Sequence, residues 1–159
     1  MVVPTRWGGG RRVVPDRIIR EVVIDAPREK VWAIVTEPRH VAGWFSDEAL
    51  IDLQPGGAML LTWHGHGAYR GRVEAVEPPH RFAFRWLRRE DNEPGEGTST
   101  FVEFLLEPEG EGTRMRVIES GFDRLDWAEP ERARYAGENT DGWVHELEQL
   151  REYAAGLDG

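Results

Sequence analysis

Hydrophobic and charged positions change their spacing twice along this chain, and these changes predict its elements. Residues 17–25, RIIREVVID, mix β-branched residues with charges over the length of one strand. The segment that follows repeats Val31, Ile34 and Val35 at helical spacing. Pro38 ends this helix, because proline disfavours helical geometry at the residue before it. A second short helix is expected to begin near Pro38.

Beyond these helices the pattern becomes an alternation with period two, which is typical of strands that bury one face. Three strands are predicted at residues 57–64, 68–77 and 80–88, separated by turns rich in glycine and proline. Two more lie within residues 99–121, joined by a Gly-Glu-Gly turn. Together these segments predict an antiparallel meander.

One long amphipathic helix, over about residues 131–155, is predicted to close the chain. Its apolar residues share one face: Trp143, Leu147, Leu150 and Ala154. Its charged residues are expected mainly outside that face: Glu146, Glu148, Arg151 and Glu152. The order of strand, two short helices, antiparallel strands and long helix predicts an α+β fold, in which a curved sheet of six or seven strands grips the last helix.

Composition excludes several classes of protein and partner. The chain has 159 residues, 40% hydrophobic and 31% charged, which suits a single globular domain over residues 16–159. Its net charge of -9 makes nucleic acid and anionic lipid unsuitable partners. The chain has no cysteine, so disulfides and thiolate zinc sites are excluded. No segment approaches the ~20 apolar residues that span a bilayer, and a cytoplasmic location is expected.

The first 15 residues differ in composition from the rest. Arg6, Arg11 and Arg12 surround three consecutive glycines, which are unfavourable inside a helix or strand. We therefore expect residues 1–15 to form a mobile basic tail, either an untethered terminus or an arm that docks on an acidic partner. The segment lacks the charge pattern of a signal peptide.

The sequence offers little catalytic chemistry. His64 and His66 lie two apart near a predicted strand end and could both face a metal ion, but no third ligand is evident, so no metal site is predicted. Gly65, Gly67 and Gly71 miss the spacing of a dinucleotide-binding loop and indicate a hairpin turn. No catalytic residue and no cofactor are predicted.

Several separated blocks nevertheless resemble a known family: IDAPREKVWAIVTEPRHVAGWF, QPGG, EAVEPPHRFAFRW, GTRMRVIESGF and DGWVHELEQL. In this order they are similar to the branch of the START/SRPBCC superfamily that is named after the activator of heat-shock protein 90 ATPase. The resemblance covers about residues 17–153. It implies the helix-grip fold, with an elongated apolar cavity between the sheet and the long helix.

The resemblance implies three alternative functions. The first is non-catalytic binding of a small apolar or aromatic molecule, such as a lipid or a polyketide-like compound, in the cavity. The second is a cochaperone or regulatory module that contacts a chaperone-type protein partner. The third is a cyclase or hydrolase that uses the same cavity.

The helix-grip fold places the second short helix near the mouth of the cavity, where Trp44 and Phe45 become candidate lid or wall residues. Adjacent rings on a short helix point in different directions. One ring of this pair is therefore expected to line the cavity, while the other fills the core.

Alternation along the strands supplies the other candidate lining residues. Those on strands are Met59, Leu61, Trp63, Phe82, Phe84, Trp86, Val102, Phe104, Met115 and Val117. Those on the long helix are Trp143 and Leu147. A plain hydrophobic core needs the same residue types, so each position has two interpretations. The expected pocket is bordered by Trp44 or Phe45, Trp63, Phe84 and Trp143.

Two further positions are informative. Counting by twos from Met115 and Val117 places Glu119 on the inner face, unless the strand frays or bulges and turns it to solvent. An inward Glu119 must be hydrogen-bonded, paired or protonated, and is then the expected polar handle for a ligand. Gly142 lies inside the long helix at a cost of about 1 kcal/mol relative to alanine, which indicates close approach by a strand, cavity space or a kink.

Overall fold

The computed structural model describes residues 16–87, 95 and 97–157. The predicted tail, residues 1–15, and the last residue of the predicted strand 80–88 lie outside this range. The elements follow in the order β1 (Arg17–Ile24), α1 (Arg28–Thr36), α2 (Pro38–Trp44), β2 (Glu48–Ile51), β3 (Ala58–Trp63), β4 (Gly67–Glu77), β5 (Arg81–Leu87), β6 (Ser99–Glu109), β7 (Gly112–Ser120), the 3-10 helix η1 (Phe122–Arg124) and α3 (Glu129–Gly156).

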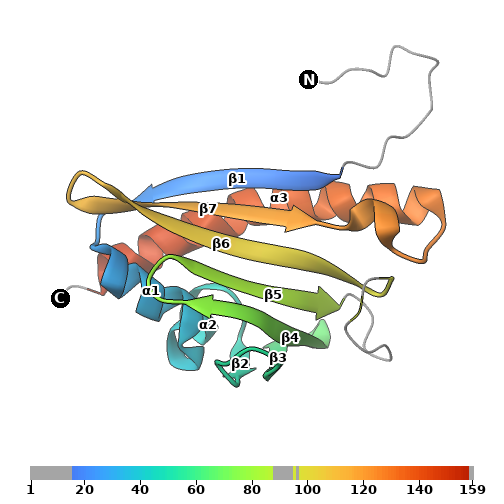
Figure 1. Cartoon of the computed structure of the whole chain (residues 1–159), viewed down its shortest axis with the longest axis horizontal. Coiled ribbons are helices and arrows are strands. Elements are labelled where there is room, and N and C mark those ends of the chain that lie inside the picture. The colour runs from blue at the N-terminus through green and yellow to red at the C-terminus, as the bar shows by residue number, and fades with distance from the viewer. Residues whose placement is uncertain (1–15, 88–94, 96, 158–159) are drawn as a thin grey trace, which may run out of the picture.

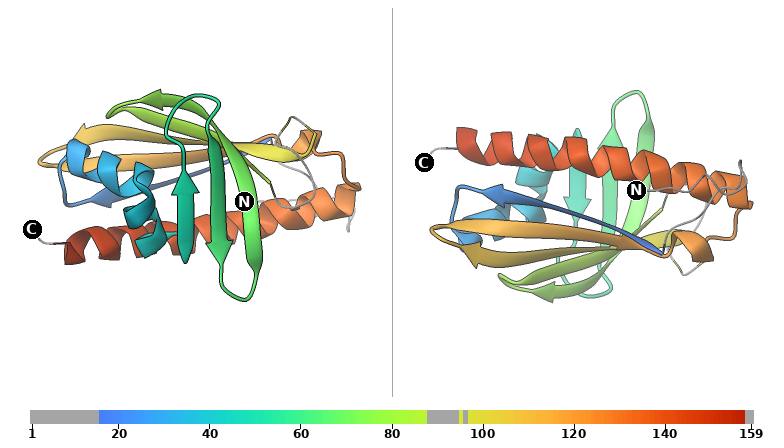
Figure 2. Two further views of the ribbon diagram at one scale, coloured as in Figure 1. Left: turned by 90° about the horizontal axis from the view of Figure 1, so that it is seen from below. Right: turned by 90° about the horizontal axis from the view of Figure 1, so that it is seen from above.

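Seven strands form one antiparallel sheet in the order β1-β7-β6-β5-β4-β3-β2. The sheet curves, and α3 runs along one of its faces (Figures 1 and 2). The short helices α1 and α2 lie at the end of the sheet where α3 finishes (Figure 2). The predicted α+β helix-grip architecture is thereby confirmed.

The structure adds one strand to the sequence prediction and starts the last helix earlier. The short edge strand β2, with the sequence EALI, was not predicted, because four residues of mixed exposure carry almost no periodic signal. The long helix begins at Glu129 rather than Glu131. Pro130 is compatible with this earlier start, because N–H groups in the first turn of a helix have no acceptor within the helix and the N–H that proline lacks is not needed there. No helix of the described residues is long and apolar enough to cross a membrane.

The adjacent rings of Trp44 and Phe45 differ in burial, although their centroids lie only 5.0 Å apart. Trp44, at the end of α2, is only 3% exposed and donates a hydrogen bond from Nε1 to the carbonyl oxygen of Ile34, at 3.0 Å. It belongs to the hydrophobic core, and its ring centroid lies 6.3 Å from that of Phe104. Phe45 is half-buried, and its ring stacks on Trp143 of α3. Trp44 therefore fills the core.

Candidate functional site

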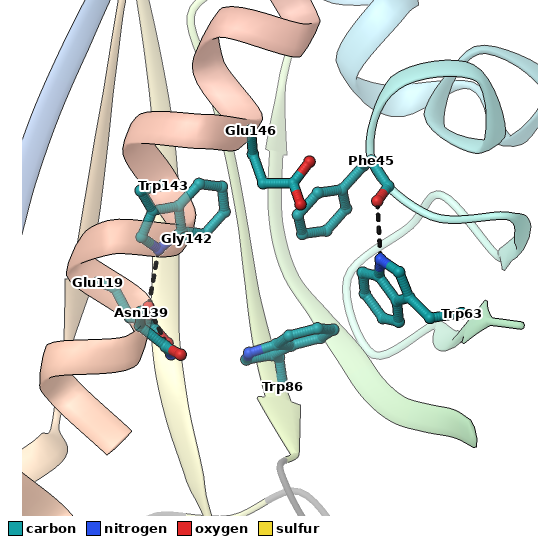
Figure 3. A pocket seen from close by; sticks show the side chains of 8 residues that line it. All are labelled: Phe45, Trp63, Trp86, Glu119, Asn139, Gly142, Trp143 and Glu146. Carbon is teal, nitrogen blue, oxygen red and sulfur yellow. Dashed lines mark hydrogen bonds between the residues drawn. The ribbon is translucent and has the colours of Figure 1, made fainter. Parts of the chain in front are cut away.

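A pocket of about 130 Å³ lies between α3 and the sheet (Figure 3). It is lined by Phe45, Trp63, Trp86, Glu119, Asn139, Gly142, Trp143 and Glu146. This volume is close to the ~150 Å³ of an engineered apolar cavity that holds benzene, whereas one water needs only about 10–15 Å³. The pocket is therefore large enough for a small organic molecule.

Four aromatic rings form most of the pocket wall. Phe45 stacks on Trp143, with centroids 5.5 Å apart and planes at 12°, and meets Trp63 edge-on at 5.4 Å. Trp63 in turn meets Trp86 edge-on at 5.4 Å. Trp63 Nε1 donates a hydrogen bond to the backbone oxygen of Phe45, at 2.9 Å, which ties β3 to the end of α2 (Figure 3). These contacts hold the rings in fixed orientations around the open space.

Glu119 faces inward from β7, as the alternation predicted, and is fully buried. Its Oε2 accepts a hydrogen bond from the Thr100 hydroxyl at 2.5 Å, and its Oε1 accepts one from Trp143 Nε1 at 2.8 Å. Asn139 Nδ2 lies 3.1 Å from both oxygens. Burial raises the pKa of Glu119, and these hydrogen bonds oppose that rise. Both carboxyl oxygens are thus already engaged by protein donors.

Glu146 is a second carboxyl at the pocket, and the sequence interpretation of this residue was wrong. It was expected outside the apolar face of the long helix, yet it is half-buried over the pocket. A residue three positions after Trp143 shares the face of that ring, and a long side chain can fold over it. Among the described residues, Glu146 Oε1 is buried without a hydrogen-bond partner. Burial raises the pKa of Glu146 to about 7.

Glu146→Gln is expected to remove a pH dependence of stability. The folded-state pKa of Glu146 is raised above 4.5. Its contribution to the free energy of unfolding is therefore fully present below pH 4.5 and is lost as pH rises through about 7. Relative to the variant, the wild type should lose about 1–2 kcal/mol of unfolding free energy between pH 5 and 8, after discounting for solvent screening. Urea unfolding across this range measures the difference.

Glu148→Gln is the matched control, because Glu148 is exposed on the same helix and Arg151 holds its pKa low. Ionised throughout the range, Glu148 should leave the pH profile unchanged when replaced. A parallel profile for wild type and Glu146→Gln would contradict the buried position of Glu146.

A second pocket of about 210 Å³ adjoins the first. It is lined by Trp63, Tyr69, Trp86, Leu87, Tyr135, Glu138 and Asn139. Trp63, Trp86 and Asn139 line both pockets, so these three side chains stand at the boundary between them. A ligand longer than one ring could extend from the first pocket into the second.

The predicted site residues divide between pocket and core. Five of the candidates line the first pocket: Phe45, Trp63, Trp86, Glu119 and Trp143. Six border only a void of about 10 Å³: Trp44, Met59, Leu61, Phe82, Phe84 and Phe104. Four are buried in the core: Val102, Met115, Val117 and Leu147. The expected border position of Phe84 is corrected, because Val35 of α1 and Val41 of α2 fill that end of the grip.

Sequence reasoning missed Asn139 and Glu146 as lining residues and left Gly142 with three interpretations. An added Cβ at Gly142 would meet nothing within 4 Å, so close approach by a strand does not explain this glycine, and its place in the pocket lining favours the cavity interpretation. The available signal was helical spacing, since positions 139, 142, 143 and 146 follow the i, i+3, i+4, i+7 pattern of one face. Asn139 and Glu146 are polar and Gly142 has no side chain, so this spacing does not stand out as an apolar face.

The histidine pair lies away from this pocket. His64 Nε2 lies 2.9 Å from Glu48 Oε2, and this hydrogen bond raises the pKa of the exposed His64. Within residues 16–87, 95 and 97–157, no group of three or more His, Asp or Glu side chains is arranged to hold a metal ion.

Solved structures with the same fold come from several bacteria. Protein MLL2253 from Mesorhizobium loti is 24% identical with a TM-score of 0.75, covering 90% of this chain and 99% of its own. Protein BH1534 from Bacillus halodurans is 27% identical with a TM-score of 0.70, covering 91% and 99%. The Aha1 dimer from Colwellia psychrerythraea is 19% identical with a TM-score of 0.70, covering 86% and 93%.

Among curated proteins, no sequence matches the chain. Residues 25–155 match the family described as activator of Hsp90 ATPase homolog 1-like protein. The match includes both short helices, β2 to β7 and nearly all of α3. The chain belongs to this family, within the SRPBCC superfamily.

Proposed function

We propose that the protein binds a small aromatic or apolar molecule in the pocket between α3 and the sheet, without transforming it. The observation that carries this proposal is the pocket of about 130 Å³ walled by four aromatic rings. Concave sites with apolar walls and a few converging polar groups are the usual form of small-molecule sites. Here the polar groups are Glu119, Asn139 and Glu146, of which Glu146 has an oxygen without a partner among the described residues.

The placement of Gly142 also supports binding. A helix gains about 1 kcal/mol when an interior glycine becomes alanine, and the surroundings of Gly142 leave room for a larger side chain. The glycine therefore keeps the pocket open at the expense of helix stability. A chain that needed only a packed core would gain from filling this space.

Benzyl alcohol, a neutral aromatic compound of suitable size, tests the proposal. We expect saturable binding by calorimetry, together with shifts of the indole N–H resonances of Trp63, Trp86 and Trp143, which line the pocket. Trp32, a half-buried ring that does not line either pocket, should not shift. Native mass spectrometry of freshly purified protein then searches for a co-purified molecule. Absence of saturable binding to benzyl alcohol would overturn the proposal.

Catalysis is a second candidate function, favoured by one observation. Glu146 combines a pocket position with a pKa raised to about 7, a value suited to a general acid or base near neutral pH. If this function holds, a bound substrate is turned over and Glu146→Gln abolishes turnover while retaining binding. Unchanged recovery of the co-purified molecule after prolonged incubation would favour binding alone.

A further inference from the structure

The described residues that line the pocket include acidic side chains but no basic ones. Its described lining consists of four aromatic rings, two carboxyls, one amide and one glycine. The adjoining pocket adds a third carboxyl, Glu138, and two phenols, Tyr69 and Tyr135. Neither described lining contains a lysine, arginine or histidine. The described residues therefore bring no positive charge to this space.

The two pocket carboxyls differ in what they offer a ligand. Glu119 accepts hydrogen bonds from Thr100, Asn139 and Trp143, so its oxygens are occupied. Glu146 Oε1 is buried and has no partner among the described residues. A buried acceptor without a donor is unfavourable, so a donor on the ligand would be stabilised there. Figure 3 shows the Glu146 carboxyl beside Phe45 at the edge of the pocket.

Resting on the proposed binding function, we propose that the ligand of this pocket is a cationic aromatic or alkyl amine, whose ammonium group contacts Glu146 and the faces of the surrounding rings. Aromatic faces carry negative charge density and attract ammonium groups, most strongly for tryptophan. Trp63, Trp86 and Phe45 line the same pocket as Glu146, and the ring of Phe45 lies next to its carboxyl (Figure 3). The carboxylate and the rings thus favour the same charge on the ligand.

The acidic side chains of the lining disfavour acidic ligands. A fatty acid or another carboxylate would bring a third acidic group to the lining that holds Glu119 and Glu146, where no described residue supplies a cation to neutralise it. The side-chain N–H donors of Asn139 and Trp143 are directed at Glu119. An anionic or acceptor-rich ligand would therefore find repulsion and few donors, which selects amines over acids.

The described pocket linings bring only two other carboxyls near Glu146. β7 provides Glu119, and α3 provides Glu138 in the adjoining pocket. β3, β5 and the end of α2 provide only the rings of Trp63, Trp86 and Phe45. Because burial raises the pKa of Glu146 to about 7, this carboxyl is largely protonated at pH 5.5 and ionised at pH 8. Affinity for an ammonium group should rise between these values, whereas affinity for a neutral molecule should not.

Three compounds that share one ring separate charge from shape: benzylamine, benzyl alcohol and benzoate. At pH 8 and low salt we expect benzylamine to bind about tenfold more tightly than benzyl alcohol, and benzoate to bind more weakly than either. At pH 5.5 the preference for benzylamine should shrink severalfold. Calorimetry measures all three, and the alcohol corrects for changes unrelated to charge.

Glu146→Gln should reduce the preference for benzylamine over benzyl alcohol to near unity, because glutamine removes the negative charge and keeps an oxygen that can accept a hydrogen bond from either compound. Glu148→Gln is the control, because it removes one exposed carboxylate from the same helix. Equal effects of the two variants would overturn the proposal, since general electrostatic attraction would then explain the preference.

The compounds also separate this inference from the binding function on which it rests. Benzyl alcohol that binds in the pocket, together with benzylamine that binds no more tightly, overturns the amine proposal and leaves the binding function intact. If benzoate binds most tightly of the three, the amine proposal is likewise overturned and the binding function remains. If none of the three compounds binds, both proposals fail.

Discussion

Replacing Glu119 by methionine is expected to lower the free energy of unfolding by about 2–4 kcal/mol, although the two side chains are close in volume. Trp143 Nε1 and Asn139 Nδ2 donate to this carboxyl inside the protein. Methionine offers them no comparable acceptor, and each unsatisfied buried donor costs about 1–3 kcal/mol. Loss of the desolvated carboxyl offsets part of that cost. Urea unfolding at pH 7 measures the change.

Glu119→Gln is the graded control for the methionine variant. Its amide oxygen can still accept from Trp143, and its amide nitrogen can donate to the Thr100 hydroxyl, so a loss of only about 1 kcal/mol is expected. A double-mutant cycle with Trp143→Phe, which removes one donor and keeps the aromatic shape, isolates the hydrogen bond. Equal stability of wild type and Glu119→Met would contradict a structural role for this carboxyl.

The same variants carry a signature in pH. Burial raises the pKa of Glu119, so the wild-type protein loses stability as pH rises through the folded-state value. Glutamine does not titrate, and the stability advantage of wild type over Glu119→Gln should therefore be largest at acidic pH and shrink as pH rises. Comparing them in a Glu146→Gln background removes the contribution of the second pocket carboxyl.

The alternation of side chains along a strand made the inward position of Glu119 predictable from the sequence. The period of a strand is two residues, so the buried positions of Met115 and Val117 fix the side on which Glu119 lies. The observed burial along β7 follows this rule over its whole length. The helix-grip architecture could likewise be predicted, because each element has its own periodicity and the order of the elements restricts the ways they can pack.

The border between core and pocket could not be predicted from the same pattern. Phe84 and Trp86 lie on alternate positions of β5, yet Phe84 packs beneath the short helices and Trp86 lines open space. Apolar residues are required in both environments, so their identity does not distinguish them. The difference arises from which helix covers each end of the sheet, which is a property of the assembled fold.

Glu146 shows the complementary difficulty. On a helical face, a charged residue three positions from an apolar one is usually a solvated neighbour, and sequence gives no sign of how its side chain folds. Here the open space beside Gly142 and Trp143 lets the carboxyl lie over the pocket rather than in solvent. Polar lining residues of this kind become visible only with the cavity itself.

Gly142→Leu is expected to abolish binding of benzyl alcohol, with a loss of affinity of about a hundredfold or more, while the fold remains intact. A side chain added at Gly142 meets no atom within 4 Å of its Cβ position and enters the pocket that the residue lines. Leucine is also a better helix former than glycine by about 0.8–1 kcal/mol, so the unfolding free energy should stay level or rise. Calorimetry and urea unfolding on the same preparation measure both effects.

Gly137→Leu is the matched control, because Gly137 is exposed on the same helix and its Cβ position is equally open. It should show the same gain from helix propensity with unchanged binding. Gly142→Ala should be intermediate, since one methyl group removes only part of a pocket of about 130 Å³. Wild-type affinity in Gly142→Leu would place the bound molecule elsewhere, whereas loss of affinity in both leucine variants would point to a change in α3 as a whole.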